Sequence, residues 1–284
     1  MERSTNVVIT GVSTGIGYEM CKSLISRGFN VYGSVRKQED ALRLSQELGE
    51  GYKPLVFDVT DHAAIETAKN DVSEAVGDEG IHALINNSGI AVGGPLLHLP
   101  IEEVQYQFEV NVLGLVKCIQ AFAPLLGARK NHGSAPGRII NISSVAGKIG
   151  MPFVAPYVGS KHAVEGISNS LRRELLLWGI EVVIVGPGAV KTPIWAKSTD
   201  MSAYNETEFG PAIKKFNNGL VKRSIEAGFE ADYIGTFVAN IVESKKPKLR
   251  YALVPQKLSN WVLPRILPQR WIDSFIARTV KLQP

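Results

Sequence analysis

The feature that most constrains the fold is an alternation of short apolar, β-branched runs with longer helical patterns. Seven runs are predicted to be strands: Val7–Thr10, Asn30–Ser34, Leu55–Asp58, Ala83–Asn86, Arg138–Ile142, Val182–Val185 and Tyr251–Val254. They show little polar alternation, as expected where helices cover both faces of a sheet. The longer segments place apolar residues three and four positions apart: Gly15–Arg27, Ile65–Val76, Val104–Leu126 and Tyr157–Trp178. This pattern predicts a doubly wound α/β fold, in which a parallel sheet with right-handed crossovers carries helices on both faces.

The alternation is interrupted in two places, and no linker, repeat or low-complexity tract separates domains. Residues from about 191 to 231 are predicted to form a helical insertion. Residues 256–284 form an extension with apolar and aromatic content and with prolines at 264 and 268. Pro124 is expected in the last turn of its helix, because proline has no backbone N–H to continue it. We therefore expect one domain, residues 1–255, with the extension 256–284 attached to it.

Composition excludes several classes of protein. The 284 residues include 45% hydrophobic and 20% charged residues, as in a soluble globular protein. The net charge is +4 and no basic stripe is present, so nucleic acid is not an expected partner. Cys21 and Cys118 are predicted to be buried thiols, and no zinc-ligand spacing occurs, so no metal is expected. No apolar leader or uninterrupted apolar run of about 18 residues is visible, which favours a cytoplasmic protein.

A glycine-rich turn follows the first predicted strand and leads directly into a helix. Its spacing is G-x-x-x-G-x-G. Glycines permit a tight turn and a close approach of phosphate, and the helix N-terminus offers free N–H groups and a favourable dipole. The turn is therefore predicted to bind the phosphates of a dinucleotide through Gly11, Ser13, Thr14, Gly15, Ile16 and Gly17.

A second pattern has the chemistry of an acid–base pair. Tyr157 and Lys161 are four residues apart at the start of a helical segment, so they share one helix face. A free tyrosine, with a pKa near ~10, is a poor base at neutral pH. A neighbouring ammonium stabilises the phenolate and brings that pKa toward the working range.

Together these motifs resemble the short-chain dehydrogenase/reductase family over roughly residues 5 to 255. The stretch Arg138–Thr192 looks most like the retinol and hydroxysteroid dehydrogenases of that family. The resemblance implies a Rossmann-like, dinucleotide-binding catalytic domain with strand order 3-2-1-4-5-6-7. It also implies a catalytic tetrad of four residues: Asn111, Ser144, Tyr157 and Lys161. Ser144 would bond the substrate oxygen, and Asn111 would help to hold a water-mediated proton relay to Lys161.

The resemblance implies further cofactor contacts. Asp58 and Val59 match the family's adenine-contacting pair, and Asn87, Ser88 and Gly89 match its loop after the fourth strand. Tyr157 and Lys161 would also contact the cofactor, with the lysine orienting its ribose. The nicotinamide would be contacted by Pro187, Gly188, Val190 and Thr192.

The choice between the two nicotinamide cofactors depends on the end of the second strand. An NAD-specific site usually has an acidic residue there, but this chain has Val35 followed by Arg36. A guanidinium can clamp a 2′-phosphate through paired hydrogen bonds, and Ser34 could add another. NADP(H) is therefore favoured. NAD(H) stays the alternative, since the family's other basic position holds Thr14.

The predicted reaction interconverts a primary or secondary alcohol and its carbonyl by hydride transfer. The expected substrate is bulky and lipophilic, of steroid or retinoid type, under a roof formed by the extension and the insertion around Trp195–Phe216. Alternatively, the extension packs on the sheet edge or on another subunit. A third possibility is that it lies on a membrane surface with four basic residues toward the head groups: Arg265, Arg270, Arg278 and Lys281.

Two other functions stay open from the sequence. One is a reductase of small polar or carrier-bound carbonyls, which would need neither roof nor extension. The other is a non-catalytic dinucleotide sensor, which would need the glycine-rich turn but not the tetrad. The resemblance also implies a homodimer or homotetramer formed through the two long helices, near Val104–Leu126 and Tyr157–Trp178.

Overall fold

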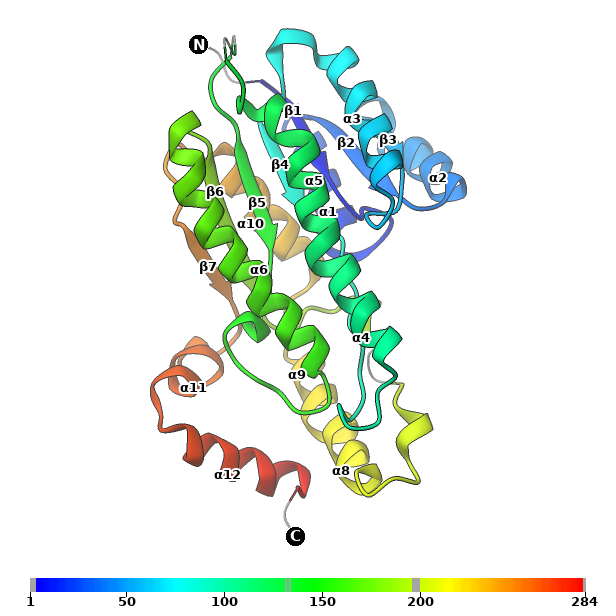
Figure 1. Ribbon diagram of the computed structural model, residues 1–284, viewed down its shortest axis with the longest axis vertical. Coiled ribbons are helices and arrows are strands. Elements are labelled where there is room, and N and C mark those ends of the chain that lie inside the picture. The colour runs from blue at the N-terminus through cyan, green and yellow to red at the C-terminus, as the bar shows by residue number, and fades with distance from the viewer. Residues whose placement is uncertain (1–3, 131, 133, 196–199, 283–284) are drawn as a thin grey trace.

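Seven parallel strands form the central sheet, in the order β3-β2-β1-β4-β5-β6-β7 (Figure 1). The computed structural model describes residues 4–130, 132, 134–195 and 200–282. The strands are β1 (Asn6–Ile9), β2 (Asn30–Val35), β3 (Tyr52–Val56), β4 (Ala83–Asn86), β5 (Arg138–Ile142), β6 (Glu181–Pro187) and β7 (Arg250–Leu253). The predicted doubly wound, Rossmann-like sheet and its strand order are confirmed.

Two hydrophobic cores lie on opposite faces of this sheet. Side chains of successive strand residues alternate between them, so that Val7 and Ile9 belong to one core and Val8 to the other. The first face is covered by α1 (Gly15–Ile25), α2 (Gln38–Leu48) and α10 (Ala231–Glu243). The second is covered by α3 (His62–Val76), α5 (Gly114–Phe122) and α6 (Ala155–Glu174), seen in front in Figure 1. Burial on both faces explains why the strands are almost uniformly apolar.

The third strand differs from the prediction of Leu55–Asp58. It begins at Tyr52 and ends at Val56, in register with β2 from Val31 to Val35. Because β3 is at the edge of the sheet, it tolerates Pro54 and leaves Lys53 and Pro54 exposed. These exposed positions hide the start of the strand in the sequence. Asp58 consequently lies beyond the strand, in the loop that follows it.

Residues 101–126 form a continuous helix of four segments. They are α4 (Ile101–Phe108), the π-helical turn η3 (Glu109–Leu113), α5, and the 3-10 turn η4 (Ala123–Leu126), so Pro124 does lie in the last turn. By length and composition alone this helix could cross a membrane, although the sequence has no uninterrupted apolar run of that length. However, 61% of its most apolar window is buried inside the protein. That burial is what a core helix packed on a sheet requires.

A third core connects the insertion to the C-terminal extension. The insertion contains η7 (Ser202–Tyr204), α8 (Gly210–Lys215), η8 (Phe216–Val221) and α9 (Lys222–Glu226). The extension contains η9 (Leu258–Val262), α11 (Leu263–Ile266) and α12 (Gln269–Val280). Val280 of α12 is buried with Phe153, Met201, Ile213 and Phe216. Helix α12 therefore packs on the insertion, away from the sheet (Figure 1).

Candidate active site

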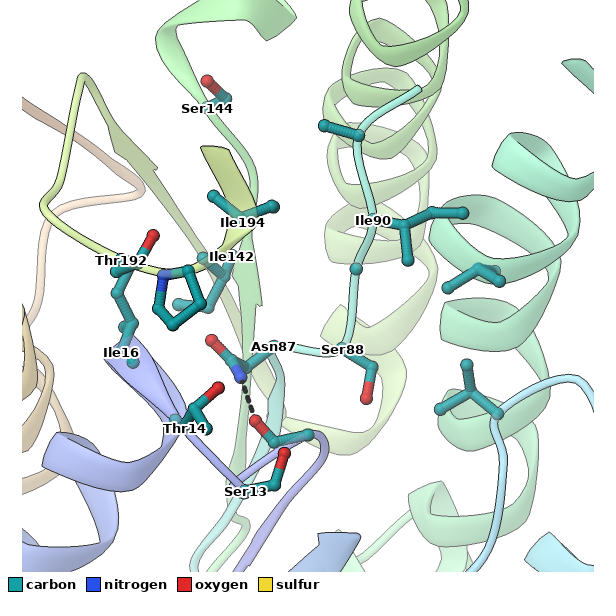
Figure 2. A pocket seen from close by; sticks show the side chains of 18 of the residues that line it. Ser13, Thr14, Ile16, Asn87, Ser88, Ile90, Ile142, Ser144, Thr192 and Ile194 are labelled. Atoms are coloured by element: carbon teal, nitrogen blue, oxygen red, sulfur yellow. Dashed lines mark hydrogen bonds between the residues drawn. The ribbon is translucent and has the colours of Figure 1, made fainter. Parts of the chain in front are cut away.

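A cavity of about 360 Å³ opens at the carboxyl ends of the central strands, the usual place for a ligand in a sheet of this type. It is lined by every residue predicted to contact the cofactor, from Gly11 to Thr192, and by Ser144. Figure 2 shows Ser13 and Ser144 at opposite ends of this cavity, with Asn87 and Thr192 between them. Asn111 is buried and is not part of the lining.

The glycine-rich turn has the backbone that its sequence requires. Gly11 and Gly15 have φ angles of +71° and +61°, which residues other than glycine rarely adopt. A Cβ atom on Gly17 would overlap the carbonyl oxygen of Gly11 and lie 2.7 Å from Asn87 Nδ2. The side chain of Thr14 makes no capping bond to the first N–H groups of α1, and the first turn holds no acidic residue. These N–H groups are therefore suited to bind an anion.

Three side chains fix this turn from outside. Asn87 Nδ2 donates hydrogen bonds to the carbonyl oxygens of Thr10 at 3.0 Å and Gly11 at 2.8 Å. The hydroxyl of Ser34 accepts a bond of 3.1 Å from the Gly11 N–H. Arg43 of α2 donates to the carbonyl oxygen of Ser13 at 2.8 Å. No sequence pattern indicated Arg43, because it is 30 residues from its partner.

At one margin of the cavity Arg36 faces Asp58. The guanidinium lies 4.0 Å from the carboxylate, and the Arg36 side chain is 64% exposed. Asp58 is oriented by bonds from the N–H and hydroxyl of Thr60, at 2.9 Å and 2.8 Å. An exposed ion pair of this length contributes little, so Arg36 can turn toward a phosphate without a large cost. These residues therefore fit an NADP(H) molecule whose 2′-phosphate lies near Arg36.

At the other end, Tyr157, Lys161 and Ser144 converge. Helix α6 begins at Ala155 with Pro156 in its first turn, a position that proline favours. Lys161 Nζ lies 5.7 Å from the centroid of the Tyr157 ring and donates a 3.0 Å bond to the carbonyl oxygen of Ile142. The Ser144 hydroxyl accepts from the Ala146 N–H at 3.1 Å, which starts the 3-10 turn η5 (Val145–Gly147).

Burial changes the proton affinities of this group. It raises the pKa of the Tyr157 phenol, opposite to the lowering expected from the neighbouring ammonium, and the hydrogen bond with Ser144 opposes that increase. It lowers the pKa of Lys161 to about 8, because the charged ammonium loses its water. The lysine proton is therefore exchangeable near physiological pH.

Asn111 lies in the π-helical turn η3, a type of turn that is frequent at functional sites. Its amide exchanges two bonds with Ile90, with N–O distances of 2.9 Å and 3.0 Å, and donates to Ser160 Oγ at 3.0 Å. A Cβ atom on Gly89 would lie 3.3 Å from Asn111 Oδ1 and 3.7 Å from Lys161 Nζ. The asparagine is thus close to the lysine and holds the loop after β4. Its role in a proton relay stays a prediction.

Several lining residues were not predicted from the sequence. Most of them are apolar or aromatic: Ile90, Ala91, Tyr106, Val110, Ile194 and Trp195. Tyr106 and Val110 lie one turn apart on the helix 101–126, and that spacing was the only signal in the sequence that they share a face.

Comparison with known proteins identifies the class of enzyme. The family model for short chain dehydrogenase matches residues 5–203, so the chain belongs to this family and is an oxidoreductase. A curated relative, the NADPH-dependent 3-dehydrocapnine reductase of Ornithobacterium rhinotracheale, is 38% identical over 96% of both chains.

Solved structures agree with this assignment. A short-chain dehydrogenase from Streptomyces avermitilis aligns with a TM-score of 0.75 and 25% identity, over 99% of this chain and 96% of its own. One from Burkholderia cenocepacia, solved in complex with NADP, aligns with a TM-score of 0.72 and 21% identity, over 99% of both chains. At that identity, the second match supports the fold alone.

Proposed function

We propose that this protein is an NADPH-dependent reductase of a ketone or aldehyde on a bulky lipophilic substrate. One observation carries the proposal. A single cavity, with apolar side chains in its lining, joins the glycine-rich turn and Arg36 to Ser144, Tyr157 and Lys161. The NADPH dependence of the relative from Ornithobacterium rhinotracheale supports the choice of cofactor.

Each part of the cavity has a role in this proposal. The turn Gly11–Gly17 binds the pyrophosphate with N–H groups of α1, Arg36 binds the 2′-phosphate, and the segment Pro187–Thr192 holds the nicotinamide amide. When bound, NADPH supplies the hydride. Ser144 donates a hydrogen bond to the carbonyl oxygen of the substrate and so polarises it.

The proton comes from the Tyr157 hydroxyl, which lies beside Lys161 and Ser144. A cationic Lys161 stabilises the phenolate left behind, and the lysine can itself give up a proton, since its pKa is about 8. Asn111 keeps the loop around Gly89 and Ile90 in place beside the lysine. This chain's own residues thus provide the proton, the oxygen contact and the cofactor cradle.

The apolar side chains in the cavity lining favour a lipophilic substrate over small polar or carrier-bound carbonyls. Ile90, Val110, Ile194 and Trp195 offer few polar anchors, although Trp195 Nε1 is occupied by a 2.8 Å bond to the Val190 carbonyl. Steroid- and retinoid-like compounds suit such walls. The relative from Ornithobacterium rhinotracheale is named as a reductase of a 3-dehydro compound, which supports the reductive direction. Among the described residues, Ile194 and Trp195 at the start of the insertion line the cavity and none from the extension does, so only the start of the insertion would cover the substrate.

A substrate panel followed by NADPH absorbance tests this proposal. It contains 3-dehydrocapnine, a steroid ketone, retinal, a small sugar ketone and an acyl thioester ketone. We expect kcat/KM for a lipophilic member to exceed that of the polar ones by about 100-fold, as apolar contacts of several methylenes provide. A polar or thioester substrate as the best of the panel would contradict the proposed substrate class.

The assignment of Tyr157 is tested by Tyr157→Phe, which removes one oxygen and preserves the ring. Turnover should fall by at least about 1000-fold, since general acid catalysis is worth that much. The dissociation constant of NADPH, measured by its fluorescence, should change less than about twofold, because the phenol is one contact among many. Substantial remaining turnover would show that another group supplies the proton.

Two proposals concern partners. The first is a homodimer or homotetramer formed through the long helices 101–126 and α6, to be tested by sedimentation. The second is peripheral contact with a membrane through the outer side of α12, where Trp271 and Phe275 are 67% and 69% exposed. Flotation with anionic liposomes, comparing the full chain with a Trp271→Ser, Phe275→Ser variant, tests it. No flotation of the full chain would reject membrane contact.

A further inference from the structure

A buried ion pair lies directly behind the catalytic serine. Glu165 is on α6, one turn beyond Lys161, and its side chain is 1% exposed. Arg250, the first residue of β7, donates from Nε to both carboxylate oxygens at 3.0 Å and from a terminal nitrogen at 2.9 Å. Lys148 Nζ lies 3.5 Å from the same carboxylate. A buried carboxylate is tolerated only with such partners. Glu165 does not line the cavity.

The pair packs against the loop that carries Ser144. A Cβ atom on Gly147, in η5, would lie 2.9 Å from Glu165 Cγ and 2.8 Å from Ser143 Oγ. A Cβ atom on Gly186, in β6, would lie 2.7 Å from the Arg250 guanidinium and 3.2 Å from the carbonyl oxygen of Ser144. Both glycines thus allow the ion pair to approach the backbone on either side of the serine.

The same arginine contacts the C-terminal extension. The Arg250 guanidinium lies 4.3 Å from the ring centroid of Trp261, and the guanidinium of Arg265 lies 4.4 Å from it. Trp261 is 7% exposed, and it is the buried residue of η9, the first element of the extension. A guanidinium over an indole is a favourable, directional contact. The extension is therefore attached to the edge strand at the residue that holds Glu165.

We propose that Glu165 and Arg250 are positioning residues for Ser144, and that Trp261 couples the docking of the extension to the geometry of the catalytic loop. The proposal rests on the proposed reductase function for its kinetic consequence. The ion pair fixes the loop between β5 and α6, and the tryptophan fixes the guanidinium. Release of the extension then loosens the support of Ser144, although none of its described residues, 256–282, lines the cavity.

Hydrogen exchange tests the positioning without any assay of activity. The N–H groups of Gly147 and Lys148 bond to the carbonyl oxygens of Ser144 and Val145, so their exchange reports the order of the loop. We expect Glu165→Gln and Arg250→Lys to accelerate exchange of the peptide 143–149 by about tenfold, at temperatures well below unfolding. Lysine keeps the charge of Arg250 but loses the planar fork.

Matched variants separate positioning from stability. Glu243→Gln removes the acidic partner of Arg27 from a more exposed ion pair. It should leave the exchange of the peptide 143–149 unchanged. Trp261→Leu, which keeps an apolar side chain, should accelerate exchange as Arg250→Lys does. If Trp261→Leu did not accelerate exchange of the peptide 143–149, the proposed coupling would be overturned. An unchanged peptide in all three variants, with only a lower melting temperature, would overturn the positioning role.

A double-mutant cycle supplies the kinetic test. Glu165→Gln should lower kcat about 10- to 100-fold, since small displacements of a reacting group have effects of that size. Because the effect acts through the serine, the same change in a Ser144→Ala background should cost less than about threefold. Equal losses in both backgrounds would overturn the proposal. If the wild type reduces no carbonyl with NADPH, the proposed function fails, and hydrogen exchange still decides the positioning role.

Discussion

The burial of Lys161 predicts that this residue lowers the stability of the protein. Its pKa is lowered from 10.5 to about 8 by loss of water around the ammonium. A tenfold change in proton affinity is worth about 1.4 kcal/mol, so the penalty for the charged form is roughly 3 kcal/mol. The lysine recovers part of this through its 3.0 Å bond to the Ile142 carbonyl, worth about 1 kcal/mol.

Replacing Lys161 by methionine should therefore stabilise the protein by about 2 kcal/mol at pH 7. The dependence on pH follows from proton binding. Below pH 8 the lysine is charged in both the folded and unfolded states, and the whole penalty is present. Between about pH 8 and 10.5 the folded state releases its proton first, so the wild type gains stability relative to the variant by about 1.4 kcal/mol per pH unit.

Urea unfolding of both proteins at pH 7, 8, 9 and 10 measures this difference. Subtracting the two free energies of unfolding removes the contributions of groups that do not contact Lys161, including Cys21 and Cys118, whose pKa values burial raises. Lys161→Arg serves as a control, since arginine stays charged throughout this range. A difference between wild type and methionine variant that is constant from pH 7 to pH 10 would refute the reasoning.

Three further predictions follow from the structure. Gly17→Ala places a Cβ atom against the Gly11 carbonyl and should raise the NADPH dissociation constant by about 100-fold, measured by fluorescence titration; an unchanged constant would contradict the close packing of the turn. Arg36→Glu should weaken NADPH by about 100-fold and NADH by less than about threefold, and equal losses for both would exclude a 2′-phosphate contact. Cys21 and Cys118 are fully buried, and burial raises the pKa of both thiols, that of Cys118 to about 12. Neither should react with a thiol reagent at pH 8 until the chain unfolds. Rapid labelling of the native protein would contradict this prediction.

Some elements could be predicted well and others poorly, for identifiable reasons. The strands β4 and β5 agree with the prediction at both ends, because both are central, fully buried strands with mostly apolar residues. The prediction did not include α2, where only Ala41 and Leu44 are buried and most positions are polar. It misplaced β3, since an edge strand carries exposed polar residues and a proline. The low apolar content of α2 and the edge position of β3 thus limited the prediction.

The same distinction applies to the candidate site. The glycine-rich turn and the pair Tyr157 and Lys161 could be recognised because each motif occupies a few consecutive residues of one element. The contact of Arg43 with Ser13 could not be predicted, since α2 must first pack beside the turn. The apolar part of the cavity lining could not be predicted either. It combines residues from the loop after β4, the helix 101–126 and the start of the insertion.

The alternation of strands with the long helices, the family resemblance, and the residues with acid–base and phosphate-binding chemistry could all be recognised from the chain alone. Periodicity and motif spacing are local properties, because each depends only on residues that are close together in the sequence. Only the tertiary structure decided how Lys161 loses its water, how α12 packs on the insertion, and how Glu165 meets Arg250, 85 residues away. Burial and long-range contact depend on the packing of elements distant in the chain, so no local pattern contains them.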